Sequence, residues 1–236
     1  MLIVKTGAAV PEARADGTDF EHWFVGGLGP NAFDYRVVRV DRGEALPAPN
    51  ATDAVLITGS PAMVSAREAW SERTARWLAD AFAAGVPMLG VCYGHQLIAH
   101  ALGGCVGPNP DGRHMGRVTA RIVDADDPLL GGLAPRADVY VSHLETVLTP
   151  PPGARRIAAA PHDPQHGLRF GRACWGVQFH PEFGARIMRA YIDARVDVLR
   201  DAGKDTAALR AALGPDTAGR HVLARFSARA RAAVAA

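Results

Sequence analysis

The sequence predicts an α/β protein with an open, mixed and mostly parallel sheet, helices on both faces and an antiparallel extension. In the first hundred residues, short apolar runs of strand length alternate with longer amphipathic segments. The runs at 53–58 and 86–91 are almost entirely apolar, as is typical of parallel strands covered on both faces. Beyond residue 104 the helical segments give way to strand-like segments, some of alternating polarity, which indicates antiparallel strands.

The first half of the chain is predicted to alternate strand and helix. Each helix carries its large apolar residues on one face. Trp70, Trp77 and Phe82 mark this face in the second helix, which ends at Gly85. The strands are expected at 2–4, 35–40, 53–58 and 86–91, and the helices at 13–29, 67–84 and 96–102.

The second half is predicted to add antiparallel strands, a long helix and an Ala- and Arg-rich tail. Loops rich in proline and glycine at 108–112 and 150–153 separate the strands. The strands are expected at 117–123, 139–142, 156–160 and 173–179, the long helix at 184–200, and surface helices at 206–213 and 218–235. We therefore expect a main domain at 1–204 and a helical extension at 205–236.

Composition and charge exclude several classes of protein. The 236 residues are 48% hydrophobic and 21% charged, with a net charge of +2. Charge therefore predicts no attraction to nucleic acid or to a membrane. No apolar run has the length of a membrane span, and the apolar stretch at the N-terminus is too short for a signal peptide. Three cysteines favour a reducing compartment over a disulfide framework, so we expect a cytoplasmic protein.

A candidate nucleophile lies at the sharpest predicted turn of the chain. The strand at 86–91 runs directly into Cys92, and a helical segment follows. Gly90-Val91-Cys92-Tyr93-Gly94 is the nucleophile-elbow pattern with cysteine in place of serine. The glycines let the chain turn without Cβ clashes, and the positive end of the helix favours the thiolate form. Cys92 is therefore predicted to attack a carbonyl carbon.

A candidate base and its partner follow a buried strand far downstream. The strand at 173–179 ends in His180-Pro181-Glu182. A cysteine nucleophile needs a base to take its proton, and the base needs an orienting group, roles that His180 and Glu182 can fill. Open α/β sheets place their ligand crevice at such strand ends, so we expect both residues beside Cys92. The plain alternative is a strand-end turn that Pro181 bends.

Together these motifs resemble the class I (triad) glutamine amidotransferase family, above all the glutaminase domain of GMP synthases and its stand-alone bacterial homologues. Four segments carry the resemblance, at 57–61, 90–96, 141–147 and 180–182. Residues 57–61 stand where the family has its Gly-Gly-Pro oxyanion loop. Residues 141–147 are similar to the family segment S-H-x-D-x-V. The resemblance covers nearly the whole chain and implies a flavodoxin-like core.

Two backbone groups are predicted to stabilise the oxyanion. In an elbow, one donor is the N–H of the residue after the nucleophile, here Tyr93, and the other comes from a neighbouring loop. Gly59 is our candidate, because it follows the strand at 53–58, which should lie beside the nucleophile strand. This chain has Thr58-Gly59 where the family has two glycines. The alternative is that 58–61 is only a strand-to-helix turn.

Substrate-binding residues follow from the resemblance. Gln96 lies one helical turn beyond the nucleophile, and the resemblance implies that it contacts the amino-acid end of glutamine. Ser142, His143 and Leu144 match the family segment that holds the same end, largely through backbone groups. Glu145 stands where the family has aspartate, and its role is open.

The remaining cysteines and two of the histidines are predicted to play no part in catalysis. Cys105 follows a Gly-Gly turn and Cys174 lies inside a predicted strand, so both are expected to be packing residues. His162 and His166 have the spacing of two zinc ligands, but Pro164 lies between them and no third ligand is evident. We expect a plain loop there, with no metal site and no cofactor.

The predicted activity is hydrolysis of the side-chain amide of L-glutamine through a Cys92 thioester, with release of glutamate and ammonia. No phosphate-binding glycine-rich motif follows the domain, so the sequence does not name the ammonia acceptor. A separate ATP-dependent synthetase subunit is the expected partner. One alternative is a stand-alone γ-glutamyl peptidase that uses the same triad on γ-glutamyl compounds. The other is a non-catalytic regulatory binding subunit with the same fold.

Overall fold

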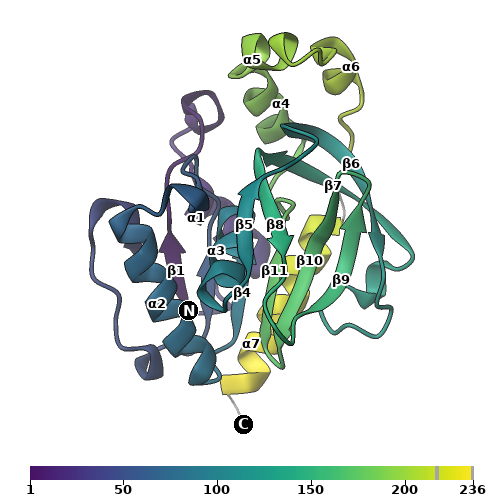
Figure 1. Ribbon diagram of the computed structural model, residues 1–236. Helices are drawn as coiled ribbons and strands as arrows, with labels where there is room; N and C mark the ends of the chain where they lie inside the picture. The colour runs from purple at the N-terminus through teal and green to yellow at the C-terminus, as the bar shows by residue number, and fades with distance from the viewer. Residues whose placement is uncertain (216–217, 235–236) are drawn as a thin grey trace.

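A computed structural model describes residues 1–215 and 218–234, which form the predicted α/β architecture (Figure 1). A mixed sheet of nine strands has the order β2-β1-β3-β4-β11-β10-β9-β6-β7, and β5 pairs with β8 in a second sheet. Neighbouring strands from β2 to β11 are parallel, and those from β11 to β7 are antiparallel. The predicted combination of a parallel half and an antiparallel extension is confirmed.

Short strands form the parallel half, and longer strands dominate the antiparallel half. The strands are β1 (Leu2–Lys5), β2 (Arg36–Arg39), β3 (Val55–Ile57), β4 (Met88–Val91), β5 (Cys105–Pro108), β6 (His114–Ile122), β7 (Arg136–His143), β8 (Glu145–Thr149), β9 (Arg155–Ala160), β10 (Asp163–Gly171) and β11 (Cys174–Val177). The helices are α1 (Phe20–Leu28), α2 (Ala69–Ala83), α3 (Tyr93–Ala101), α4 (Ala185–Asp193), α5 (Val196–Asp201), α6 (Thr206–Ala211) and α7 (Ala218–Val234).

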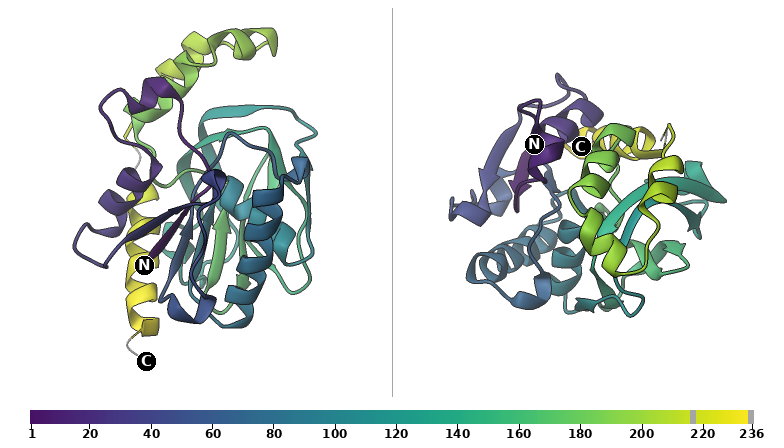
Figure 2. Two further views of the ribbon diagram at one scale, coloured as in Figure 1. Left: turned by 90° about the vertical axis from the view of Figure 1, so that its left-hand side faces the viewer. Right: turned by 90° about the horizontal axis from the view of Figure 1, so that it is seen from above.

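Helices cover both faces of the sheet. Side chains of a strand point alternately to opposite faces. Leu2 and Val4 therefore pack with α2 and α3, whereas Ile3 packs with α1, α4 and α7. Figure 2 (left) shows α7 along one face of the parallel strands and α2 along the other. Burial on both faces explains why these strands are almost entirely apolar. None of the helices in the described ranges combines the length and hydrophobicity that a membrane crossing requires.

The stretch around His162 and His166 contains a strand, so the expectation of a plain loop was wrong. β10 pairs with β9 and β11, and His166 is fully buried within it. Pro164 is tolerated because it is exposed and lies where the register of the ladder shifts, between Asp163 and Gly167. β5 and β8 also form where no strand was predicted.

Two predicted helices depart most from their expected bounds. α1 starts only at Phe20, because the Asp19 carboxylate caps it by accepting a hydrogen bond from the Phe20 N–H at 2.8 Å. The helix expected at 184–200 is divided into α4 and α5 at Arg195, whose φ of −128° and ψ of 23° are not helical. Neither proline nor glycine stands at this break, so no local signal announces it.

The C-terminal tail forms α6 and α7, which begin at the predicted residues. The expectation of a surface helix needs correction for α7, because Val222, Leu223 and Phe226 are buried in the core beside α1. Their spacing makes an apolar stripe on an otherwise Ala- and Arg-rich helix. The predicted helix end at Ala235 lies outside the described residues. The division of the chain at residue 204 stays a prediction.

Candidate active site

Three neighbouring parallel strands end at the same level of the sheet. Val91 of β4 is level with Val177 of β11, and Ile57 of β3 is level with the residue before Val91. The chain leaves this edge at the predicted oxyanion loop, at Cys92 and just before His180. The register of the parallel strands therefore explains why residues far apart in the sequence meet at one site.

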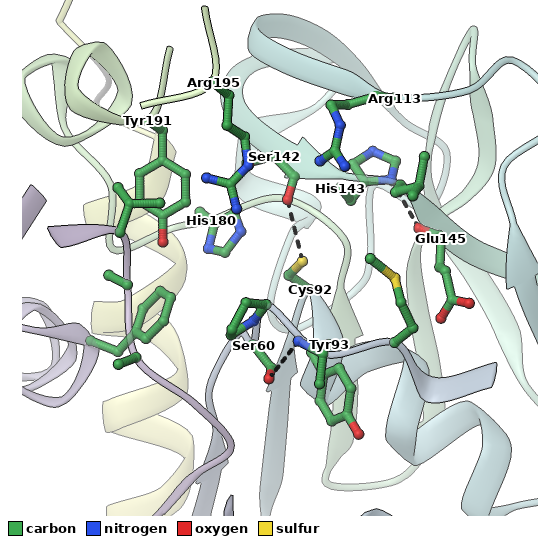
Figure 3. Close-up of a pocket in the computed structure, with 18 of the residues that line it drawn as sticks. Ser60, Cys92, Tyr93, Arg113, Ser142, His143, Glu145, His180, Tyr191 and Arg195 are labelled. Carbon is green, nitrogen blue, oxygen red and sulfur yellow. Dashed lines mark hydrogen bonds between the residues drawn. The ribbon is translucent and has the colours of Figure 1, made fainter. Parts of the chain in front are cut away.

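Cys92 occupies the turn between β4 and α3 in a backbone conformation that L-residues rarely adopt. Its φ is 51° and its ψ is −103°, values typical of glycine. Gly94 gives the turn room, because a Cβ at this position would lie 2.5 Å from the Ile57 carbonyl oxygen. Cys92 is 6% exposed, and its sulfur lies at the floor of a cavity (Figure 3). The predicted strand, turn and helix are present, and the strained backbone belongs to the cysteine itself.

His180 and Glu182 form a buried pair just beyond β11. His180 Nδ1 and Glu182 Oε1 are 2.7 Å apart, and Phe183 stacks on the imidazole with ring centroids 4.1 Å apart. Burial alone would lower the pKa of His180. The Glu182 carboxylate, with a smaller contribution from the neighbouring Cys92 side chain, outweighs burial and raises this pKa to about 10. The imidazole is therefore positively charged at neutral pH, next to the sulfur.

The predicted oxyanion donors come from the start of α3 and from the loop after β3. Tyr93 is the first residue of α3, so its N–H has no acceptor within the helix. Gly59 packs against His180, since a Cβ at Gly59 would lie 2.9 Å from Cε1 of that ring. The Thr6 hydroxyl donates to the Gly59 carbonyl oxygen at 3.0 Å and holds the loop. The next residue, Ser60, lines the cavity, and sequence analysis did not name its N–H.

The cavity above Cys92 has a volume of about 310 Å³, which suits a small molecule. Its two ends differ in character (Figure 3). Gln96 and the turn at 142–145 line one end. His180, Tyr191 and the mostly apolar segment at 8–11 line the other. A ligand whose carbonyl carbon lies at the Cys92 sulfur can therefore extend in two directions.

The residues expected to bind substrate lie together at the first of these ends. Gln96 Nε2 donates to the Glu145 carbonyl oxygen at 2.7 Å and to Gln178 Oε1 at 3.0 Å. Both amide hydrogens are thus used, and only the side-chain oxygen of Gln96 is left for a ligand. The Ser142 carbonyl oxygen lies 3.8 Å from the Cys92 sulfur, so the turn at 142–145 reaches directly over this sulfur.

Glu145, whose role the sequence left open, fastens the turn at 142–145 to a neighbouring segment. Its carboxylate accepts hydrogen bonds from the Ser65 hydroxyl and, at 3.3 Å, from the Ser65 N–H. Its backbone carbonyl accepts a hydrogen bond from His143 Nδ1 at 3.0 Å. Leu144 lines the cavity within this turn. These bonds fix the backbone shape of the turn that was predicted to hold substrate.

Four histidines pack together next to this turn. The rings of His114 and His162 stack with centroids 3.8 Å apart, and that of His143 lies 5.5 Å from His162. His166 lies 5.5 Å from His162. Burial lowers the pKa of His143 to about 3 and that of His162 to about 4, so both rings are neutral at pH 7. Among the described residues, no three His, Cys, Asp or Glu side chains are arranged to hold a metal ion.

The two other cysteines lie outside the cavity. Cys174 is buried in β11, and burial raises the pKa of its thiol. Its environment agrees with the packing role expected for it. Cys105 is exposed on β5, so it is not the packing residue that was expected. Neither cysteine is in a disulfide.

Three large polar residues of the cavity had not been singled out from the sequence as site residues. Tyr191 was assigned only to the apolar face of a helix, and Arg113 and Arg195 carried no motif. All three line the cavity, and Figure 3 shows the two guanidinium groups above Cys92. An arginine is ordinarily a surface residue, so only the three-dimensional arrangement distinguishes these two.

The family model of class-I glutamine amidotransferases matches residues 16–195, and the chain belongs to this family. A GMP synthase [glutamine-hydrolyzing] of Aeropyrum pernix is 38% identical over 140 residues, which are 59% of this chain and 25% of that protein. The match thus spans about a quarter of the length of such relatives. The resemblance inferred from the sequence motifs is confirmed.

Solved structures show the same fold. A glutamine amidotransferase of Thermotoga maritima superposes with a TM-score of 0.73 at 20% identity, covering 100% of this chain and 99% of that one. A glutamine amido transferase of Methylobacillus flagellatus superposes with a TM-score of 0.75 at 24% identity, covering 97% and 94%. At these identities the likeness concerns the fold alone.

Proposed function

We propose that this protein hydrolyses the side-chain amide of glutamine with a triad of Cys92, His180 and Glu182. The observation that carries the proposal is the buried His180–Glu182 pair at the same sheet edge as Cys92. The carboxylate orients the ring and keeps it positively charged at neutral pH, and such a cation stabilises a neighbouring thiolate. A strained elbow at the cysteine supports the same interpretation.

The proposed reaction has two steps. The Cys92 sulfur bonds to the amide carbon, and backbone N–H groups of Tyr93 and of the loop at 59–60 stabilise the oxyanion. One such donor typically contributes about 3 kcal/mol to the transition state. The C–N bond breaks as His180 gives its proton to the leaving ammonia. Water, deprotonated by His180, then cleaves the thioester, and glutamate leaves.

The amino-acid end of glutamine is proposed to lie at the end of the cavity formed by Gln96 and the turn at 142–144. The free oxygen of Gln96 can accept a hydrogen bond from the substrate ammonium group. The backbone of Ser142, His143 and Leu144 is held in place by the bonds of Glu145, which favours recognition through backbone groups.

We further propose that the ammonia is used by a separate ATP-dependent synthetase. The similar proteins that are named GMP synthase are about four times as long as the matched segment, which supports a further component for the synthetic step. A cytoplasmic location is part of this proposal. It is supported by three free cysteines, which a reducing compartment would keep reduced.

Ammonia release from glutamine tests the proposed triad. Cys92→Ala should lose at least about 10³-fold in kcat, because the covalent step is removed. Cys105→Ala and Cys174→Ala serve as matched controls and should keep most of the activity. A glutamine-like diazoketone should label only Cys92, as found by peptide mapping. Near-normal turnover by Cys92→Ala would contradict the triad, and a wild type that is neither active nor labelled would favour a non-catalytic binding subunit.

A further inference from the structure

Two arginines reach over Cys92 without an anionic partner among the residues that the structure describes. Arg113 precedes β6, and Arg195 stands between α4 and α5; both line the cavity. Figure 3 shows their guanidinium groups above the sulfur, one near His143 and the other near His180. Within 1–215 and 218–234, neither side chain makes a hydrogen bond or an ion pair. Arg195 lies over an aromatic ring, that of Tyr191, at 5.6 Å from the centroid.

Several other arginines of this protein are paired with carboxylates. Examples are Arg117 with Asp138, Arg155 with Asp124, Arg186 with Asp16 and Arg210 with Asp193. These pairs lie on the surface, where an ion pair contributes little to the stability of the folded protein. The two cavity arginines are half-buried. Charges there are less screened by water, so an unpaired guanidinium costs more free energy than it does on the surface.

The positive charge of the two arginines is left for a ligand to neutralise. Burial, together with the charge of Arg195, lowers the pKa of Arg113, which shows that the two cations disfavour each other. Glu145 is the one carboxylate among the described residues that line the cavity, and Ser65 engages its oxygens. An anion bound from solution would therefore stabilise this arrangement.

Arg113 lies at the end of the cavity that is proposed to hold the amino-acid end of glutamine. His114, the first residue of β6, pairs with His143, the last residue of β7. Arg113 therefore stands beside the turn at 142–145. This position suits the α-carboxylate of the glutamyl group, which accounts for one of the two cations.

Arg195 lies at the opposite end, where the leaving group must go. The helix break at Arg195 brings its side chain over Tyr191 and toward His180 (Figure 3). His180 is proposed to give its proton to the leaving nitrogen, so this end of the cavity receives the amine part of the substrate. Ammonia carries no group that a guanidinium could bind. The second cation is therefore unexplained by glutamine.

We propose that Arg195 binds a carboxylate on the amine part of the substrate, so that the site that hydrolyses glutamine also hydrolyses γ-glutamyl amides of amino acids, and does so with a higher kcat/KM. This inference rests on the proposed function, because the same Cys92 thioester forms. The C–N bond between the γ-carbonyl and the amino acid breaks, and the His180 proton goes to the amino acid nitrogen. Water then releases glutamate. The planar fork of a guanidinium matches a carboxylate with two parallel hydrogen bonds.

A matched pair of dipeptides tests the preference. γ-Glutamylglycine and γ-glutamylglycinamide differ only in a carboxylate that is replaced by a neutral carboxamide. The wild type should hydrolyse γ-glutamylglycine with a kcat/KM about 10- to 100-fold higher, the range that a hydrogen bond to a charged group supplies. Its kcat/KM should also exceed that for glutamine.

Substitutions of Arg195 identify the residue responsible. Arg195→Met should abolish the preference by lowering kcat/KM for γ-glutamylglycine alone. The kcat/KM values for γ-glutamylglycinamide and for glutamine should stay within about twofold of the wild-type values. Arg195→Lys keeps the charge without the fork and should retain part of the preference. Arg200→Met, at an exposed position of α5, is the control and should behave as the wild type. If Arg195 had a merely structural role, Arg195→Met would lower kcat/KM for both dipeptides equally.

Binding to the Cys92→Ala variant separates this inference from the proposed hydrolysis. Calorimetric titration should give a Kd about tenfold or more lower for γ-glutamylglycine than for the glycinamide. Equal affinities, equal kcat/KM values or a preference that survives Arg195→Met would overturn the carboxylate site, even if glutamine is hydrolysed. Absence of any hydrolysis would overturn the proposed function, whereas a tighter complex with γ-glutamylglycine would still support the site.

Discussion

Replacement of Cys92 by glycine should relieve strain that replacement by alanine retains. The φ of 51° and ψ of −103° at this residue are values that cost a non-glycine residue about 1–3 kcal/mol. Alanine keeps its Cβ and therefore keeps this cost, whereas glycine adopts the same angles freely. Both substitutions remove the sulfur, so they differ only in one methyl group and in backbone freedom.

Cys174 provides the matched control, because it is equally buried but lies in β11 with an ordinary strand conformation. At Cys174, glycine should be less stable than alanine by about 1.5 kcal/mol, from about 0.8 for the lost methyl group and about 0.7 for backbone entropy. At Cys92 the same loss is offset by about 1–3 kcal/mol of relieved strain. The stability of the glycine variant at Cys92 should therefore lie between about 0.5 kcal/mol below and about 1.5 kcal/mol above that of the alanine variant.

Urea unfolding of the four variants measures this difference. The free energies of unfolding, extrapolated with a common m-value, give the gap between glycine and alanine at each position. The gap at Cys92 should exceed that at Cys174 by about 1–3 kcal/mol in favour of glycine. If glycine destabilises both positions to the same extent, the elbow is not strained. Unequal m-values would show that the backbone of one variant has rearranged.

Three further predictions concern the site and its surroundings. His180→Ala should lower kcat at least about 10⁴-fold and Glu182→Gln less, because the base is indispensable whereas the carboxylate orients it; equal, negligible losses would place the base elsewhere. Gly59→Ala should lower kcat at least about tenfold, because its Cβ would lie 2.9 Å from His180 Cε1; unchanged kinetics would contradict that packing. His143 and His162 have lowered pKa values in the folded protein, so below about pH 6.5 the unfolded chain binds more protons than the folded one. The free energy of unfolding should therefore decrease as the pH is lowered, by up to about 2 kcal/mol at pH 5 for His143 alone. A Tm that is equal at pH 7 and pH 5 would refute this.

The turn that holds Cys92, the proposed nucleophile, could be predicted from the sequence because its determinants are local. A tight turn between an apolar strand and a helix needs small neighbours, and Gly94 fits because a Cβ would meet the backbone of β3. The pairing of Cys92 with His180 required one further assumption, that parallel strands end at one edge of a sheet. The observed register of β4 and β11 bears out this assumption.

Elements that depend on distant packing could not be predicted in the same way. β10 holds buried polar residues, and its Asp163 accepts a hydrogen bond from Thr146 at 2.8 Å. Such a strand lacks the apolar pattern by which strands are recognised in a sequence. α7 has few large apolar residues, but Val222, Leu223 and Phe226 all lie on the one side that meets α1 and the sheet. The partner surfaces decide the burial of both elements.

Arg195 and Arg200 differ only in what their side chains face. Both lie near the C-terminal end of the helix predicted at 184–200, and their chemistry is identical. Tyr191 and Leu199 are buried on either side of the break, so tertiary packing favours the bend even though no glycine or proline interrupts the helix. The bend directs Arg195 into the cavity and leaves Arg200 in solvent. A preference for a second carboxylate would therefore depend on a backbone break that the surrounding fold imposes.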